Sequence, residues 1–251
     1  MTPQLRVLER EITACELCPR LRAWCHEVAR VKRRAYFDQE YWGRPVPGFG
    51  DPAARLVIVG LAPGAHGSNR TGRVFTGDAS GDLLYRVLYR AGFANRPESQ
   101  RRDDGLRLKD AWISAAVRCA PPDNKPTREE IETCRPFLER ELALLHRTRV
   151  FVALGKIAFD NWLTMLRSRG LVASRAAFAF AHGAEFEIPG APLLISSYHP
   201  SRQNTQTGRL TEEMLQQVFL RARAVIDADI RSGSRGRADR PLERRTKACV
   251  P

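Results

Sequence analysis

Short runs of apolar residues mark the strands of this chain. They are rich in β-branched residues, and none shows a clean alternation of apolar and polar positions. Such continuous runs are typical of strands that are buried on both faces of a parallel sheet. The pattern therefore predicts four buried strands, at Leu56–Gly60, Ala111–Val117, Val150–Leu154 and Leu193–Tyr198.

Between these runs, apolar residues recur every three or four positions, which is the spacing of amphipathic helices. Thr127 and Glu130 have the spacing of a capping box at a helix start. We expect helices at Ser80–Ala91, Thr127–Leu145, Ile157–Leu166 and Thr211–Ile226, and over Pro3–Val28 with an interruption between Cys15 and Cys18.

Strands that alternate with helices predict an α/β fold, with a parallel sheet covered by helices on both faces. In such sheets, ligands bind beyond the carboxyl ends of the strands. The segments that follow Gly60, Val117, Leu154 and Tyr198 are therefore the first places to look for a functional site.

The composition is that of an ordinary globular protein, with 43% hydrophobic and 27% charged residues in a chain of 251. We expect one domain over residues 1–230 and a basic, disordered tail over residues 231–251, which are rich in Arg, Gly and Ser. No apolar stretch approaches the ~18–20 residues that cross a bilayer, and the first residues lack the apolar segment of a secretory signal. We therefore expect neither membrane insertion nor export.

The charge balance points to a polyanionic partner. Lys and Arg number 41 against 28 Asp and Glu, which gives a formal net charge of +13. A basic surface also favours solubility, but nucleic acid is the commonest partner of so basic a protein.

Four of the six cysteines form a pattern suited to a metal centre. Cys15 and Cys18 form a CxxC pair, and Cys119 and Cys134 follow about a hundred residues later. Four thiolates suit either a tetrahedral zinc or an iron–sulfur cluster, and the spacing alone leaves both open. The two remaining cysteines are interpreted as ordinary thiols, Cys25 in the core and Cys249 in the tail.

The loop after the first strand, GLAPGAHGSNRTGRVFTGD from Gly60 to Asp78, is the most informative segment of the chain. It contains neither a P-loop motif nor a GxGxxG sequence. Its glycines allow a ligand to approach the backbone closely, and it ends on Phe75 and Asp78 ahead of a helix. This combination favours a pocket for a flat, polar ligand.

The last predicted strand runs into a second polar loop, Tyr198–Asn204. His199 lies at its carboxyl end, where the fold rule places function, so we assign it a functional role. The other histidines are interpreted as ordinary polar residues: His26, His66, His146 and His182.

Taken together, the glycine-rich loop, the loop CAPPDNKP at 119–126, the segment SYHPSRQN at 197–204 and the four cysteines resemble the family 5 (B-type) uracil-DNA glycosylases. The resemblance extends from about Ile12 to Arg223. It implies a three-layer α/β/α fold with a central four-stranded parallel sheet. It also implies a [4Fe–4S] cluster, with four ligands: Cys15, Cys18, Cys119 and Cys134.

The resemblance suggests a role for each pocket residue in flipping and hydrolytically excising a base. Backbone around three residues would line the base pocket: Gly60, Ala62 and Gly64. Phe75 would stack on the base, although a core aromatic is a serious alternative. Asp78 would polarise the attacking water or stabilise the oxocarbenium ion, and a helix N-cap is an equal alternative. Asn124 would contact the base or water, or is only a turn residue. His199 would donate a hydrogen bond to the departing base anion.

DNA contacts are expected from two loops. The segment Ser201–Asn204 would enter the minor groove, with Arg202, Gln203 and Asn204 holding the gap left by the extruded base. Lys125, Arg73 and Arg118 are candidate phosphate contacts. The implied partners are double- and single-stranded DNA with deaminated bases, bound by a monomer in the cytoplasm and in association with the nucleoid.

Two positions depart from better-known uracil glycosylases. Leu61 stands where many relatives have an acidic residue, and Ala115 stands where relatives often have Asn to recognise the edge of uracil. Fewer base-specific hydrogen bonds reduce discrimination. We therefore expect other deaminated bases, such as hypoxanthine, to be excised as well.

Three alternative functions are each suggested by part of the sequence. A bifunctional glycosylase needs an amine nucleophile, for which Lys156 is the candidate, but an ordinary surface lysine is the favoured interpretation. A non-catalytic iron–sulfur nucleic-acid-binding protein is the main alternative. A small-molecule nucleotide hydrolase is disfavoured, because the chain has no Walker motif and no Asp-rich metal site.

Overall fold

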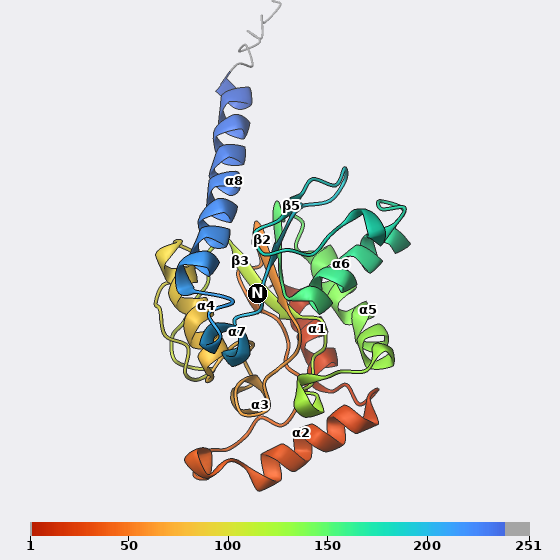
Figure 1. The fold of residues 1–251 in the computed structure, drawn as a ribbon, viewed down its shortest axis with the longest axis vertical. Helices are drawn as coiled ribbons and strands as arrows, with labels where there is room; N and C mark the ends of the chain where they lie inside the picture. Colours follow the sequence, from red (N-terminus) through yellow and green to blue (C-terminus); the bar gives the residue numbers. More distant parts are fainter. Residues whose placement is uncertain (1, 239–251) are drawn as a thin grey trace, which may run out of the picture.

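A computed structural model describes residues 2–238, with a mainly parallel sheet at its centre (Figure 1). The parallel strands are β3 (Ala111–Ala115), β2 (Leu56–Gly60), β4 (Val150–Leu154) and β6 (Leu193–Ser197), in that order across the sheet. They confirm the four predicted strands. Two-residue antiparallel strands extend the edges, β1 (Phe49–Gly50) beside β3 and β5 (Glu185–Phe186) beside β6.

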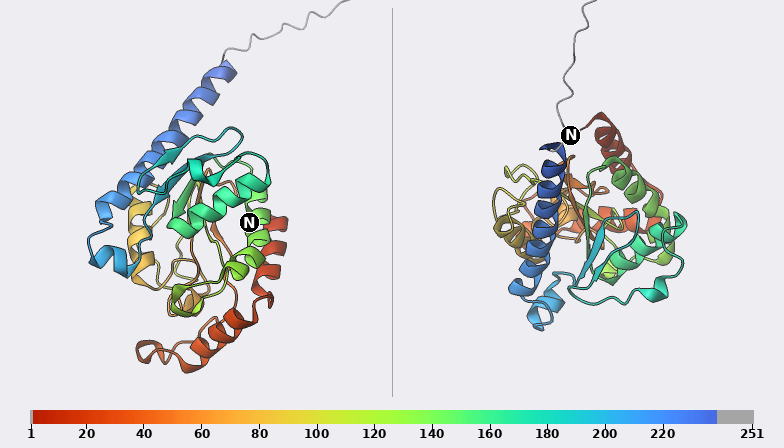
Figure 2. Two further views of the ribbon diagram at one scale, coloured as in Figure 1. Left: turned by 45° about the vertical axis from the view of Figure 1, so that its right-hand side comes forward. Right: turned by 90° about the horizontal axis from the view of Figure 1, so that it is seen from above.

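Every residue of β2, β3 and β4 is buried, as expected for strands covered on both faces. One face packs against α4 (Ala79–Arg90) and α8 (Glu212–Ala238), and the other against α5 (Arg128–Leu144) and α6 (Lys156–Ser168). Figure 2 shows the sheet between these two helical layers. The predicted α/β/α architecture is therefore confirmed.

The N-terminal segment forms two helices, α1 (Pro3–Thr13) and α2 (Pro19–Val31), and the break between them contains the CxxC pair. The predicted interruption of the first helix is thus confirmed. Two short helices lie in the loops of interest, α3 (Ser68–Thr71) and α7 (Arg202–Gln206). Three 3₁₀ turns complete the described elements: Arg34–Tyr36, Pro122–Asn124 and Arg175–Ala177.

Local hydrogen bonds explain where the helices begin. Thr127 accepts a hydrogen bond from the amide of Glu130, whose carboxylate in turn accepts one from the amide of Thr127, so the predicted capping box is present. Asp78 caps α4 and Ser201 caps α7 with side-chain oxygens that accept hydrogen bonds from first-turn amides, without the reciprocal bond of a capping box.

The final helix is longer than the sequence pattern predicts. α8 continues to Ala238, well beyond the predicted end at Ile226, and so extends into the first residues of the predicted tail. The remainder of the predicted tail lies outside the described residues. Across the described part of the chain, no helix has both the length and the apolar character that a membrane span requires.

Candidate active site and a cysteine-lined cavity

The glycine-rich loop leaves β2 at the carboxyl edge of the sheet and is held in shape by one buried guanidinium. Arg70 is 8% exposed, and its Nε donates to the carbonyl of His66 at 2.8 Å. Its Nη2 donates to the carbonyl of Gly77, also at 2.8 Å. One side chain therefore ties together two distant points of the loop, immediately before Asp78.

Phe75 fits because a glycine lies beneath it. A Cβ atom on Gly60 would lie 2.6 Å from Cζ of the Phe75 ring, too close for any side chain. Phe75 has a left-handed backbone (φ 49°), and its ring stacks against the imidazole of His199, with 5.6 Å between centroids. The ring is 8% exposed and belongs to the core, so the core-aromatic interpretation is correct as far as packing goes. The predicted stacking on a base stays a prediction.

Asp78 has two oxygen atoms in different settings. Oδ1 accepts hydrogen bonds from the amides of Ser80 at 3.1 Å and Gly81 at 3.0 Å, which confirms the N-cap interpretation. Oδ2 faces the loop, where a Cβ on Gly64 or Gly67 would lie 2.8 or 1.9 Å from it. The carboxylate can therefore cap the helix with one oxygen and present the other toward the glycine-rich loop.

Burial raises the pKa of Asp78, although the two capping amides act in the opposite direction. Burial lowers the pKa of His199 to about 4, so the imidazole is neutral at pH 7. A neutral imidazole still carries one N–H and can donate it to a negatively charged group. The structure thus brings together a carboxylate oxygen, an imidazole and an aromatic ring around glycine-rich backbone.

The backbone of His199 is fixed by the loop that follows it. The side-chain amide of Asn204 donates to the carbonyl of His199 at 2.8 Å. The backbone amide of Asn204 donates to the hydroxyl of Ser201 at 3.3 Å. Arg202 and Gln203 are exposed, as a minor-groove contact requires. Asn204 therefore positions the backbone of His199, a role that the sequence did not reveal.

Asn124 and Lys125 lie on an exposed turn. Asn124 adopts a left-handed conformation (φ 56°) in the turn Pro122–Asn124, which confirms the interpretation as a turn residue. Within residues 2–238, no hydrogen bond links its side chain to Asp78 or His199. Its contact with a base or water stays a prediction, as does the phosphate contact of Lys125.

Two predicted phosphate contacts are wrong, because the arginines are buried in ion pairs. Arg73 is 3% exposed and pairs with Asp104 at 2.6 Å, and Arg118 is 2% exposed and pairs with Glu141 at 2.8 Å. Lys156 is exposed and pairs with Asp160 at 2.6 Å, which confirms it as an ordinary surface residue.

Ala115 and Leu61, the two positions that differ from better-known uracil glycosylases, lie at and just beyond the ends of the central strands. Ala115 ends β3 directly opposite Gly60 and is buried. Leu61 follows Gly60, and its carbonyl accepts from the amide of Val117. His182, by contrast, is an ordinary polar residue as predicted, since its ring contacts the backbone of Tyr198 and Met214.

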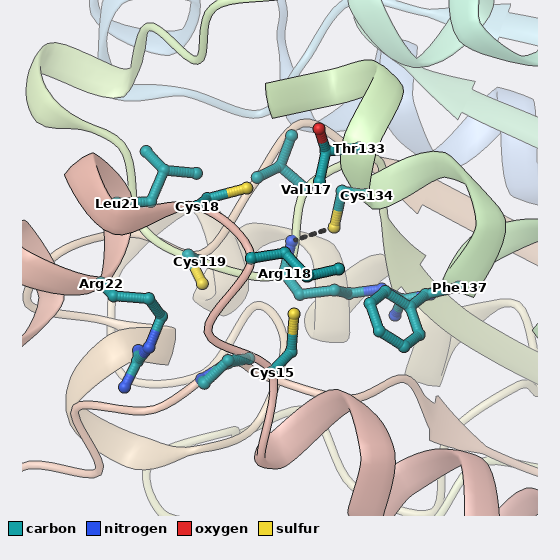
Figure 3. A pocket seen from close by; sticks show the side chains of 12 residues that line it. Cys15, Cys18, Leu21, Arg22, Val117, Arg118, Cys119, Thr133, Cys134 and Phe137 are labelled. Carbon is teal, nitrogen blue, oxygen red and sulfur yellow. Dashed lines mark hydrogen bonds between the residues drawn. The ribbon is translucent and has the colours of Figure 1, made fainter. Parts of the chain in front are cut away.

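The four predicted cysteine ligands line one cavity (Figure 3). Cys15 and Cys18 come from the break between α1 and α2, Cys119 follows β3, and Cys134 lies on α5. In Figure 3 their sulfur atoms surround a common space. Chain segments far apart in the sequence therefore meet at this point.

The surroundings of the cavity fit a group bound by thiolates. The amide of Arg118 donates to Sγ of Cys134 at 3.3 Å, the kind of hydrogen bond that surrounds cluster sulfurs. Burial raises the pKa of Cys134 to about 11, so without a metal its thiol stays protonated. Within residues 2–238, no three potential ligands gather closely enough to hold a single metal ion. A [4Fe–4S] cluster is larger than one ion and holds its thiolates further apart, so the donor set is compatible with it.

Cys25 is not part of this lining. It is fully buried, and its thiol donates to the carbonyl of Ala120 at 3.6 Å, as expected for a core cysteine. Cys249 lies outside the described residues.

The class of protein follows from the α/β/α fold, from the loops at the carboxyl edge of its sheet and from comparison with known proteins. A family model described as the uracil DNA glycosylase superfamily matches residues 47–223. Type-5 uracil-DNA glycosylases of Thermus thermophilus, Mycobacterium leprae and Pyrobaculum aerophilum are 55%, 52% and 46% identical to the chain. Each alignment covers 84% of this chain, and 94%, 91% and 88% of the respective relatives. The chain therefore belongs to the type-5 uracil-DNA glycosylases.

Proposed function

We propose that the protein removes uracil from DNA by hydrolysing the bond between the base and deoxyribose. The main support is that Asp78, Phe75 and His199 come together at the glycine-rich loop, at the carboxyl edge of the sheet. Relatives named as type-5 uracil-DNA glycosylases, which match most of the chain, support the same activity. The alternative of a non-catalytic nucleic-acid-binding protein is not favoured.

Glycosidic hydrolysis separates charge, because the base leaves as an anion while positive charge grows on the sugar. His199 would donate a hydrogen bond from its N–H to the departing base, which a neutral imidazole can do without first being protonated to imidazolium. Oδ2 of Asp78 would orient water or stabilise the sugar cation. Phe75 would stack on the flipped base. Flipping itself requires roughly a few kcal/mol, which binding must supply.

The direct test is cleavage of a uracil-containing oligonucleotide in the presence of EDTA. We expect an abasic product in single- and double-stranded DNA, since the proposed roles fall to side chains rather than to a divalent ion. Reduction with borohydride should trap no covalent complex, because the activity is proposed to be monofunctional. An oligonucleotide that keeps its uracil and shows no alkali-labile abasic site under all conditions would rule the proposal out.

Base selectivity gives a second expected result. With Ala115 at the end of β3, the pocket has no side-chain amide at this position to recognise the edge of uracil. We expect excision of hypoxanthine as well as uracil, with normal adenine untouched. A glycosylase assay on matched duplexes measures this. If hypoxanthine survives as completely as adenine while uracil is removed, the broad selectivity is wrong.

We propose that the cavity holds a [4Fe–4S] cluster on Cys15, Cys18, Cys119 and Cys134. The group would tie the break between α1 and α2 to β3 and α5. Support comes from the four thiols around one space and from the amide that donates to Cys134.

Replacing Cys134 with Ser should abolish bound iron and the broad visible absorption of the purified protein, and should lower its melting temperature. Iron content, absorbance and thermal unfolding measure this. Met165→Ala is the control for loss of stability alone, because Met165 is fully buried in the core that packs against α6 and does not line the cavity; it should lower the melting temperature and keep the iron. Equal iron in wild type and Cys134→Ser would contradict the assignment.

We further propose that the protein acts as a monomer on DNA in the cytoplasm, in association with the nucleoid. All the proposed catalytic groups come from one chain, so the pocket needs no second copy. Light scattering of the free and DNA-bound protein would test the monomer.

A further inference from the structure

A short basic segment after α2, residues 32–37, exposes both cationic side chains and an aromatic ring. We refer to it as the basic arm. Lys32, Arg33 and Arg34 precede Phe37, whose side chain is 72% exposed. Arg33 and Arg34 are exposed and have no acidic partner within 4.0 Å in the described part of the chain. The arm thus presents two unpaired cations and an uncovered aromatic ring.

The arm is tied to the glycine-rich loop. The guanidinium of Arg70 lies 3.9 Å from the centroid of the Tyr36 ring, and its Nη1 donates to Gln39 at 2.5 Å. The hydroxyl of Tyr41 accepts from the amide of Arg33 at 3.3 Å and lies 3.1 Å from Nδ1 of His66. In Figure 1 the chain beyond α2 accordingly turns close to α3.

The same Arg70 holds the loop that leads to Asp78. Its bonds to the carbonyls of His66 and Gly77 are made by the guanidinium that stacks on Tyr36. Because one buried side chain holds both segments, the arm is fixed on the same edge of the molecule as the pocket. A DNA strand that delivers a base to the pocket would pass near the arm.

Lys32 anchors the backbone of Phe37 and lies beside its exposed ring. Nζ of Lys32 donates to the carbonyl of Phe37 at 3.3 Å and lies 5.9 Å from the centroid of its ring. Unpaired cations beside an aromatic face are the combination that binds phosphates and stacks on bases. Two carboxylates, Asp38 and Glu40, follow Phe37 on the exposed chain and confine the basic character to residues 32–37.

We propose that the basic arm is a second DNA contact, separate from the loop Ser201–Asn204, with Arg33 and Arg34 on phosphates and Phe37 against a base or sugar beside the flipped nucleotide. This inference rests on the proposed function, because it takes DNA as the substrate. It assigns the arm to binding and leaves bond cleavage to the pocket.

The charge contact is tested with Arg33→Ala/Arg34→Ala against a control of equal charge, Arg167→Ala/Arg169→Ala. The control residues are exposed at the far end of α6, which begins at the carboxyl end of β4 and therefore carries them away from the edge of the sheet where the pocket lies. Each phosphate contact contributes about 0.9 to the slope of log affinity against log salt. We expect the slope on an undamaged duplex to fall by about 2 for the arm variant and to stay unchanged for the control, measured by fluorescence anisotropy.

The aromatic contact is tested with Phe37→Ala, which should weaken binding about tenfold, and with Phe37→Trp, which should restore it. Tyr89→Ala is the control, since Tyr89 is also exposed but lies at the far end of α4 from Asp78. For all arm variants, the single-turnover rate at saturating enzyme should match wild type.

Two results would overturn the proposal: equal salt slopes in the arm variant and wild type, or Phe37→Ala binding DNA as wild type does. Binding to undamaged DNA does not depend on cleavage. Failure of the arm and failure of the glycosylase activity are therefore distinguishable in the same set of proteins.

Discussion

Replacing Asp78 with Asn should lower the single-turnover rate of uracil excision by about 10²- to 10⁴-fold, the range for loss of a positioned catalytic base. Asn keeps an oxygen that can cap α4, and Asn and Asp are similar in this position. The substitution therefore removes the negative charge at Oδ2 while keeping the helix start. Single-turnover kinetics on a uracil duplex measure the effect.

Asp82→Asn is the matched control, because Asp82 lies in the first turn of the same helix but is exposed. It should retain nearly full activity. If Asp78→Asn cleaves as quickly as this control, Asp78 has no role in the chemistry and serves only as the cap.

The same Asp78→Asn substitution should leave the folded protein as stable as wild type or more stable, although it lowers the excision rate. Burial raises the pKa of Asp78 in the folded chain, so the folded protein binds this proton more tightly than the unfolded chain does. Stability from this group is therefore greatest at low pH and falls as pH rises through the raised pKa. At pH 7 the neutral Asn avoids this cost, and we expect Asp78→Asn to melt at or above the wild-type temperature. A large drop in melting temperature would instead show that the charged carboxylate stabilises the fold.

Replacing His199 with Phe should reduce the excision rate by about 10²- to 10³-fold, as expected when one donor to a developing anion is lost. A Phe side chain keeps a ring beside Phe75, whose centroid lies 5.6 Å from that of His199, and removes the single N–H donor and the acceptor nitrogen of the imidazole. His199→Gln offers an amide N–H and should recover part of the rate. Equal activity in the Phe and Gln variants would remove the hydrogen bond from the mechanism.

The pH dependence of His199 can be measured separately. Its pKa falls from 6.5 to about 4 on burial, so between these values the unfolded chain binds a proton that the folded chain does not. Stability from the neutral ring is complete above pH 6.5 and is lost as pH falls toward 4. The melting temperature of His199→Phe should therefore decrease less between pH 7 and pH 5 than that of wild type. An identical decrease in both proteins would contradict a neutral imidazole in the folded protein.

The sequence predicted the parts of the fold that depend on local pattern. Four continuous apolar runs predicted the parallel strands, and the spacing of Thr127 and Glu130 predicted the start of α5. β1 and β5 were missed, because two residues cannot establish a period. The length of α8 was missed because Arg, Gly and Ser near its end are poor indicators of a helix.

Only some residues of the candidate site could be predicted from the sequence. His199 and Asp78 could be placed because the ends of strands and the starts of helices are visible in the sequence. The burial of Arg73 could not, since its partner Asp104 is about thirty residues away and a charge gives no sign of its pairing. Arg70 was missed for the same reason, because the backbone carbonyls that it binds leave no trace in residue type.

The ion pair between Arg118 and Glu141 joins the two functional regions. Arg118 directly precedes Cys119, and Glu141 also accepts a hydrogen bond from Ser114, which is adjacent to Ala115 at the end of β3. Because one carboxylate bonds to both groups, Glu141 fixes the position of the strand that ends at Ala115 relative to the segment that leads into Cys119.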